Sequence, residues 1–313
     1  MGAFIIRRLL STLLVMGLVG VFIFLLLHLS PGDPAAIIAG DNATPAQIEA
    51  IRTSLGLNDP LHVQFGRWAV RVLNGDLGIS IFSNVPVATL IGQRVWPTVS
   101  LAFTTIVLAV ALALAAGVLA AWKAGSLADR LVMILSVVGF SVPVFVVGYL
   151  LIYVFAITLR WLPVQGYSPL AEGFWPWASH LILPSTALGL AYVALIARIT
   201  RTAMLDVLAE DYMRTARAKG VATGPMLFKH ALKSAGIPIV TVVGIGIALL
   251  IGGVVITETV FNLPGIGRLV VDAISKRDYP IIQGVILLFS GVYVIINLLV
   301  DLSYTLLDPR IRY

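Results

Sequence analysis

Six apolar segments, each long enough to cross a lipid bilayer, constrain this chain more than any other feature of its sequence. A hydrocarbon core about 30 Å thick needs about 20 apolar residues in helical form. The segments are residues 9–29, 98–122, 131–159, 181–203, 237–257 and 281–307. Hydrophobic residues make up 59% of the 313 residues, which is well above the composition of a soluble domain. Because backbone polar groups must be satisfied within lipid, the sequence predicts an all-α polytopic membrane protein with six transmembrane helices.

The distribution of lysine and arginine between these segments predicts the orientation of the chain, because short cytoplasmic loops are enriched in both. With the N-terminus inside, thirteen basic residues lie on the cytoplasmic side: Arg7, Arg8, Lys123, Arg130, Arg198, Arg201, Arg214, Arg217, Lys219, Lys229, Lys233, Arg310 and Arg312. The short outer loops then hold four: Arg160, Arg268, Lys276 and Arg277. The long segment 30–96 is left out of the count, since long loops cross the membrane regardless of charge. Both termini are therefore expected in the cytoplasm.

These spans divide the chain into three parts. Residues 1–96 are expected to form an N-terminal transmembrane helix and an extracytoplasmic helical segment. Residues 97–307 are expected to form the transmembrane core, with a cytoplasmic elbow at 205–236, and residues 308–313 a cytoplasmic tail. The formal charge of +6 and pI of 9.7 suit either nucleic acid or an anionic membrane surface. The position of the charges beside apolar spans favours the membrane, so we expect no nucleic-acid partner.

The outer segment carries signals for two short helices. The stretch TPAQ at residues 44–47 combines an N-cap threonine, a proline at the first helical position and a capping-box glutamine. This helix is predicted to stop at Gly56. A second helix is predicted over residues 60–73, ending at an Asn-Gly pair. One apolar face of that helix consists of Leu61, Phe65, Trp68 and Val72.

Several kinds of chemistry are excluded by the residues that the sequence lacks. There is no cysteine, so disulfides and thiolate chemistry are excluded. No GxxxxGK[ST] loop occurs, so the chain is not expected to hydrolyse ATP, and we expect no catalytic residue, bound metal or cofactor in it. A self-contained secondary carrier usually needs a carboxylate or a broken helix near the midplane. Pro143 is placed to break the third span, but no acidic residue accompanies it, which disfavours that class without excluding it.

The densest basic stretch is YMRTARAKGVATGPMLFKHALK, residues 212–233. A helix is predicted from Leu205 to Gly220, with an i,i+4 pair between Glu210 and Arg214 on its polar side. Its apolar stripe consists of Leu205, Leu208, Ala209, Tyr212 and Ala216. Pro225 then opens a second, basic helix that runs through Lys233.

Together the two helices form an elbow between the fourth and fifth spans, and Gly236 with Pro238 begins the fifth. A compact, charged elbow of this kind suits docking into a groove of another protein. The alternative is a basic segment that lies on anionic lipid headgroups.

Two spans carry small residues where helices are expected to pack closely. Ala109, Ala113, Gly117 and Ala121 recur every four residues, and Gly244, Gly246, Gly252 and Gly253 are crowded into another span. Small residues at such positions allow helix backbones to approach each other. Plain helix packing is the simpler interpretation, and a face that slides during gating is the alternative.

The stretch ETVFNLPGIGRL, residues 258–269, follows the fifth span. Pro264 and Gly265 are predicted to occupy the two central positions of a type II turn. Gly267 is expected to allow a close backbone approach before a short helix, in which Arg268 and Asp272 are spaced as an i,i+4 pair.

Several stretches resemble one family of transport proteins. Aligned on Gly220, the elbow is similar to the cytoplasmic loop of permease subunits of binding-protein-dependent ABC importers, whose pattern is Glu-Ala-Ala, three residues, Gly, nine residues, then Ile-x-Leu-Pro. Here the triplet is Arg-Thr-Ala at 214–216 and the later element is His-Ala-Leu-Lys at 230–233, so the family's Glu and Pro are both replaced. Further stretches resemble the dipeptide, oligopeptide and nickel branch of that family: LLLHLSPGDP (25–34), LGLNDPLHVQF (55–65), GDLGIS (75–80), ETVFNLPGIG (258–267), RDYP (277–280) and NLLVDLSYTLLDPRIRY (297–313).

The resemblance implies a type I importer fold and a set of partners. These are a second, similar permease, two cytoplasmic ATPases that hold ATP and magnesium, an extracytoplasmic substrate-binding protein, and membrane lipid. Transport would proceed by alternating access, with peptides as the substrate class and nickel chelates, glutathione or glycosides as alternatives. A secondary carrier and a non-transporting scaffold are the remaining classes.

The resemblance also implies roles for two sets of residues. The ATPase-coupling loop would include Arg214, Ala216, Arg217, Lys219, Gly220 and His230. The stretch after the fifth span is either a tight connector or an outer gate shared with the partner permease. The gate would consist of Phe261, Leu263, Pro264 and Gly265, with Phe261 and Leu263 as an apolar plug.

Overall fold

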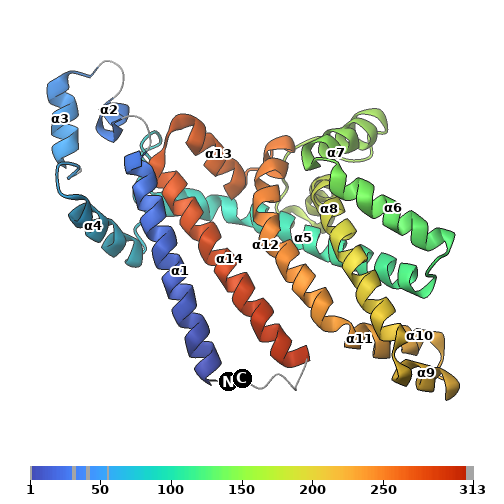
Figure 1. The fold of residues 1–313 in the computed structure, drawn as a ribbon. Coiled ribbons are helices and arrows are strands. Elements are labelled where there is room, and N and C mark those ends of the chain that lie inside the picture. The colour runs from blue at the N-terminus through green and yellow to red at the C-terminus, as the bar shows by residue number, and fades with distance from the viewer. Residues whose placement is uncertain (1, 30–32, 40–42, 55, 308–313) are drawn as a thin grey trace. The chain divides into compact units, whose positions relative to one another are not determined.

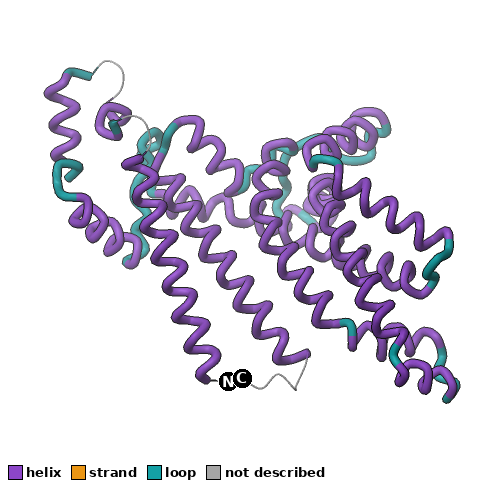
Figure 2. Tube along the Cα trace, viewed as in Figure 1, coloured by secondary structure: helices purple, strands orange, loops and turns teal. Residues whose placement is uncertain are grey.

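The computed structural model describes residues 2–29, 33–39, 43–54 and 56–307, and nearly all of them lie in helices and turns (Figure 1; Figure 2). The predicted tail at 308–313 lies outside the described residues. Within the described residues, β-type pairing is limited to one bridge between Ile79 and Pro86. The elements are α1 (Gly2–Leu29), α2 (Pro34–Ala39), α3 (Pro45–Ser54), α4 (Leu61–Leu73), α5 (Val87–Trp122), α6 (Leu127–Ser141), α7 (Val144–Leu151), η1 (Ile152–Thr158), η2 (Leu170–Glu172), α8 (Phe174–Ala209), α9 (Asp211–Ala218), α10 (Thr223–Pro225), η3 (Met226–Ala231), α11 (Leu232–Ser234), α12 (Gly236–Val260), α13 (Ile266–Lys276) and α14 (Tyr279–Leu307).

The chain divides into two compact units. The first contains residues 1–94 and 269–294, and the second contains residues 95–268 and 295–313. Residues 269–294 join the first unit although they are remote in sequence, because the first half of α14 packs on α1. The Gln283 side chain donates to the Ile23 carbonyl at 3.3 Å, and Gly291 faces Met16.

In the first unit, the two short helices follow the sequence signals. The Thr44 backbone N–H donates to the Gln47 side chain at 2.8 Å, and the Gln47 N–H donates back to the Thr44 hydroxyl at 3.4 Å. This reciprocal pair confirms the capping box at the start of α3. The Arg52 guanidinium donates to Asp33 at 2.5 Å, and this hydrogen bond raises the pKa of Arg52.

Two members of the predicted apolar face of α4, Phe65 and Trp68, pack on α1, whereas Leu61 is exposed. The ring of Phe65 meets that of Phe24 edge-on with centroids 5.4 Å apart, and Trp68 lies 5.9 Å from Phe24. Gly20 leaves room for the Trp68 ring. The stretches GDLGIS and RDYP also meet in this unit, where the buried Ser80 hydroxyl donates to the buried Asp278 carboxylate at 2.6 Å.

Four described helices are long and apolar enough to cross a membrane: α5, α8, α12 and the Tyr279–Ser303 part of α14. The third predicted span is not one helix over 131–159. It begins at Leu127 and bends by 104° between α6 and α7. The bend has a local cause, because Pro143 lacks the N–H that helix continuation requires and Val142 before it is extended.

The second unit is held together by close packing of α5, α8, α12 and the second half of α14. A Cβ on Gly117 of α5 would lie 2.8 Å from the Ala197 carbonyl of α8. A Cβ on Gly253 of α12 would lie 2.6 Å from the Leu188 side chain of α8, and Gly244 is crowded by Val300. Gly117, Gly244 and Gly253 therefore serve close helix packing, as the simpler interpretation predicted, whereas Gly252 is exposed with nothing within 4 Å of its Cβ position.

Candidate functional site

The elbow at residues 205–236 has a helix break at Glu210, where a continuous helix was predicted. Helix α8 runs to Ala209, Glu210 is extended with φ −64° and ψ 146°, and α9 starts afresh at Asp211. The single helix predicted up to Gly220 is therefore wrong. The predicted Glu210–Arg214 pair is wrong too, because Arg214 pairs with Asp211 at 3.3 Å instead.

The second half of the elbow is a nearly continuous helical stretch from α10 through η3 to α11. It begins at Thr223, two residues before the predicted start, and Pro225 lies within its first turn. Gly220 ends α9 with φ +79°, a left-handed conformation that favours glycine, as the sequence predicted. No heavy atom lies within 4 Å of the position that a Cβ on Gly220 would take, so conformation rather than crowding selects glycine.

The elbow is anchored to the ends of three long helices. Met213 of α9 and Met226 and Leu227 of η3 are buried in one apolar cluster. The rest of this cluster comes from α5, α8, the end of the elbow and the start of α12: Val118, Ala121, Ala203, Met204, Ala231, Ala235 and Ile239. The elbow is therefore in direct side-chain contact with α5, α8 and α12.

The outward side of the elbow carries the predicted coupling residues. Arg214, Arg217, Lys219, Gly220 and His230 are exposed, and Ala216 is half-buried. Tyr212 and Phe228 are also exposed, at 48% and 62%. Tyr212 was predicted on the apolar stripe, but the break at Glu210 ends that stripe and Met213 is buried instead. The elbow thus presents aromatic rings and cations together.

A partly buried ion pair joins α6 and α8 in the second unit. The Arg201 guanidinium of α8 binds the Asp129 carboxylate with two hydrogen bonds of 2.5 and 2.8 Å. Asp129 also accepts from the Gly125 backbone N–H at 2.9 Å, and Ser126 caps α6. In the sequence Arg201 is recognisable only as a cytoplasmic charge, because its partner lies 72 residues away.

The α12–α13 turn (residues 258–268) is closed by its own contacts. The predicted type II turn is wrong, because Asn262, with φ 52°, takes the left-handed conformation and Gly265 does not. Gly265 is needed for space, since a Cβ there would overlap the Glu258 carboxylate. Gly267 allows the predicted close approach, with a Cβ position only 2.7 Å from the Val255 Cα. The Arg268 guanidinium donates to the Asn262 side chain rather than to Asp272.

The four predicted gate residues lie in different environments. Phe261 and Leu263 are 2% and 0% exposed and belong to the main apolar cluster of the second unit, with Leu101, Leu181 and Val254 among its members. Gly265 is buried, and Pro264 is exposed. In this conformation the apolar pair contacts its own chain.

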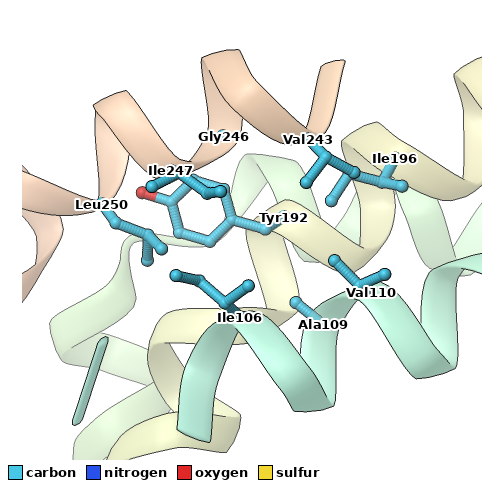
Figure 3. A pocket seen from close by; sticks show the side chains of 9 residues that line it. All are labelled: Ile106, Ala109, Val110, Tyr192, Ile196, Val243, Gly246, Ile247 and Leu250. Atoms are coloured by element: carbon cyan, nitrogen blue, oxygen red, sulfur yellow. The ribbon is translucent and has the colours of Figure 1, made fainter. Parts of the chain in front are cut away.

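A small pocket lies between α5, α8 and α12 (Figure 3). Its lining consists of Ile106, Ala109, Val110, Tyr192, Ile196, Val243, Gly246, Ile247 and Leu250. The Tyr192 ring projects from α8 between α5 and α12, and its hydroxyl is the single polar side-chain group of the lining. Such a lining offers no charged clamp for a substrate.

Comparison with known proteins identifies the family of this helical membrane protein. The family model described as "Binding-protein-dependent transport system inner membrane component" matches residues 113–313, and its N-terminal companion matches residues 1–102. The chain therefore belongs to the binding-protein-dependent transport system inner membrane components, the permeases of ABC importers, and is a multi-pass protein of the inner membrane.

Similar proteins extend over the whole chain. It is 62% identical, across 100% of both sequences, to a probable peptide ABC transporter permease protein, y4tP, of Sinorhizobium fredii (strain NBRC 101917 / NGR234). It is 46% identical, across 99% of both, to the glutathione transport system permease protein GsiC of Escherichia coli (strain K12). A chain of the inward-facing MetNI methionine ABC transporter matches with a TM-score of 0.57 and 18% identity, covering 70% of this chain and 96% of that one. This likeness confirms the type I importer fold.

Proposed function

We propose that the chain moves peptides inward across the membrane as one of two permease subunits of an ABC importer. ATP would be hydrolysed on two separate cytoplasmic subunits, and an extracytoplasmic binding protein would deliver the substrate. The name of the 62% identical relative, which matches from end to end, supports the peptide class. Glutathione is the second candidate, because a permease named for it is 46% identical over nearly the whole chain. Nickel chelates, glycosides and a secondary carrier have less support.

The elbow is the observation that carries this proposal. Its exposed residues include Tyr212, Phe228 and several cations, and the anchors of docking surfaces are often aromatic or arginine side chains. Its buried face packs on α5, α8 and α12. An ATPase bound outside would therefore move three long helices through Met213 and its neighbours.

Charge reversal on the elbow tests this coupling. In the full complex reconstituted in liposomes, Arg217→Glu with Lys219→Glu should uncouple ATP hydrolysis from uptake while membrane insertion stays intact. Lys123→Glu with Arg130→Glu is the matched control, because it makes the same change at exposed residues beside the α5–α6 turn. Normal uptake by the elbow variant, or equal loss in the control, would reject the assignment.

The proposed topology has six spans, cytoplasmic termini and an extracytoplasmic segment at 30–96 beside which the binding protein docks. Since the chain has no cysteine, single cysteines at Asn58 and Thr223 can be labelled without background. An impermeant thiol reagent should label the first in spheroplasts and spare the second. The reverse pattern would overturn the orientation.

The proposed outer gate consists of the α12–α13 turn and its counterpart in the partner permease. The exposed Pro264 is the member of the set that a facing subunit can touch, whereas Phe261 and Leu263 support the turn from within the core. Opening of the gate would raise ion leak and ATPase activity without binding protein. If a bulky Pro264→Trp variant leaves ion leak, ATPase activity and uptake unchanged, the turn is only a connector.

The substrate class is tested on the cognate binding protein. Calorimetric titration with dipeptides, oligopeptides and glutathione should give binding for a peptide, and uptake of the same compound should require ATP. Binding of glutathione alone would favour the second candidate.

A further inference from the structure

The α12–α13 turn is built around one fully buried carboxylate. Glu258, at the end of α12, is 0% exposed. Its Oε1 accepts from the Thr98 hydroxyl of α5 at 2.5 Å, and its Oε2 accepts from the Arg268 backbone N–H at 2.9 Å. The Thr98 hydroxyl oxygen in turn accepts from the Ile266 backbone N–H at 2.8 Å. Two side chains thus join α5, the end of α12 and the start of α13.

The glycines of the turn make this arrangement possible. A Cβ on Gly265 would overlap the Glu258 carboxylate, and a Cβ on Gly267 would lie 3.0 Å from Glu258 Oε2. The absence of both side chains lets the carboxylate reach the backbone N–H groups of the first turn of α13. Those N–H groups have no partner within their own helix, so they are natural donors to a carboxylate.

A carboxylate is an expensive choice for a buried position unless its hydrogen bonds are made. Apolar side chains such as Phe261 and Leu263 already fill the core at this turn. Packing alone therefore does not account for a glutamate at position 258. The glutamate makes the packing of the turn conditional, because its burial is favoured by hydrogen bonds that Thr98 and the start of α13 donate.

We propose that Glu258, acting with Thr98, is a positioning residue that locks the start of α13 to α12 and α5, so that the turn moves as one body with α12 during transport. This inference rests on the proposed function for its role in transport. The lock itself is a property of the second unit, and it can be tested separately.

A matched pair of threonine variants isolates the hydroxyl. Thr98→Val removes the hydroxyl that bridges Glu258 and Ile266 at nearly constant shape. Thr257→Val makes the same change one residue before Glu258, where the buried hydroxyl donates only to the Gly253 carbonyl of its own helix, at 2.9 Å. Thr98→Ser keeps the bridging hydroxyl and serves as the rescue variant.

Thiol labelling in the assembled complex measures whether the lock is closed. Ile266→Cys places a thiol at a position that is 3% exposed, at the first residue of α13. Thr98→Val should raise the labelling rate of this thiol by a maleimide about tenfold, since a lost hydrogen bond to a charged group shifts local opening by about that factor. Thr257→Val should leave the rate unchanged, and Thr98→Ser should restore it to within about twofold of the parent.

A second thiol separates local opening from general loosening. Ala231→Cys lies at a fully buried position in the elbow cluster. Its labelling rate should be the same in all threonine variants. The proposed lock is wrong if Thr98→Val raises the labelling rate equally at both thiols. It is also wrong if Thr98→Val and Thr257→Val give the same labelling rate at Ile266→Cys. Glu258→Gln should also raise the labelling rate at Ile266→Cys. If the Gln variant does not assemble, the Thr98→Val result is the deciding test.

Transport provides the second readout. In the reconstituted complex, Thr98→Val should lower the uptake per ATP hydrolysed about tenfold, with Thr98→Ser near the parent value. Faster labelling at Ile266→Cys with unchanged uptake would overturn the positioning role. A parent complex that takes up no substrate would instead count against the proposed function, while the labelling result would still decide whether the lock exists.

Discussion

The elbow and the α12–α13 turn are both short connections rich in glycine and charge, yet they are built in opposite ways. The elbow keeps its charged residues exposed and anchors itself through apolar side chains such as Met213 and Met226. The turn buries its carboxylate and four apolar side chains, Phe261 and Leu263 among them, and exposes Asn262 and Pro264. The elbow thus leaves its charged surface accessible to a partner, whereas the α12–α13 turn uses its buried side chains to fix the backbone.

The glycines differ in the same way. Gly220 in the elbow has a left-handed backbone and open space around it. Gly265 and Gly267 in the turn have ordinary backbone angles and no space for a side chain. Substitutions in the turn should therefore affect folding first, and substitutions in the elbow should affect coupling first.

The largest expected effect is that of Phe261→Ala. Truncating a phenylalanine at 2% exposure leaves a cavity and should destabilise the second unit by about 3–5 kcal/mol. Phe228→Ala in the elbow, at 62% exposure, is the matched control and should leave stability within about 0.5 kcal/mol. Thermal unfolding followed by tryptophan fluorescence measures both, and equal stability of the two variants would mean that the turn is not closed as described.

The next effect is that of Gly267→Ala, which should destabilise by about 1–3 kcal/mol because the added methyl group meets the backbone of Val255. Gly224→Ala is its control in the elbow, where nothing lies within 4 Å of the new Cβ. The control should unfold at the parent temperature. If both variants unfold at the same temperature, close approach does not explain the glycine at 267.

The two regions also differ in how far the sequence predicts them. The capping box at 44–47, the end of α9 at Gly220 and the break at Pro143 follow from local backbone chemistry, and local signals were enough to place them. The long apolar segments likewise predicted the positions of the long helices, because insertion of a helix into lipid depends on its composition.

Other features depend on contacts between remote residues, which no local pattern carries. Thr98 and Glu258 are 160 residues apart, and Thr98 and Ile266 are 168 apart. The interpretation of Pro264-Gly265 as a type II turn was wrong for this reason, since Gly265 is required by the Glu258 carboxylate and not by a positive φ. The spacing of Glu258, Gly265 and Gly267 was the available sequence signal, but it does not indicate that Thr98 is the hydrogen-bond partner.

The helix break at Glu210 had no clear sequence signal, and it changed which side chains the elbow exposes. A continuous helix would have buried Tyr212 on the apolar stripe. The restart at Asp211 turns Met213 inward and leaves Tyr212 at 48% exposure. The two-helix form of the elbow was therefore predictable from the sequence, but the exposure of Tyr212 was not.

Gly220→Ala tests the left-handed end of α9. Alanine at φ +79° costs about 1 kcal/mol, and with open space around it no further penalty is expected. The unfolding temperature should fall slightly, while uptake per ATP should fall more, because the turn sets the angle between α9 and α10. Gly220→Asn, which tolerates this conformation better, should recover most of the loss. If Gly220→Ala and Gly220→Asn lose uptake per ATP equally, the left-handed backbone conformation does not explain the glycine at position 220.

The smallest expected effect is that of Asp211→Asn. The Asp211–Arg214 pair spans 3.3 Å between highly exposed side chains, and such pairs contribute little to stability. The unfolding temperature should therefore not change. The variant nevertheless releases the Arg214 cation, so ATPase subunits with a complementary acidic groove should bind the chain slightly more tightly, by about twofold at low salt and less at high salt. Binding to the chain in nanodiscs of neutral lipid measures this without headgroup attraction. Weaker binding would show that Asp211 itself faces a cation of the partner, and the docking surface would then be mixed in charge rather than basic.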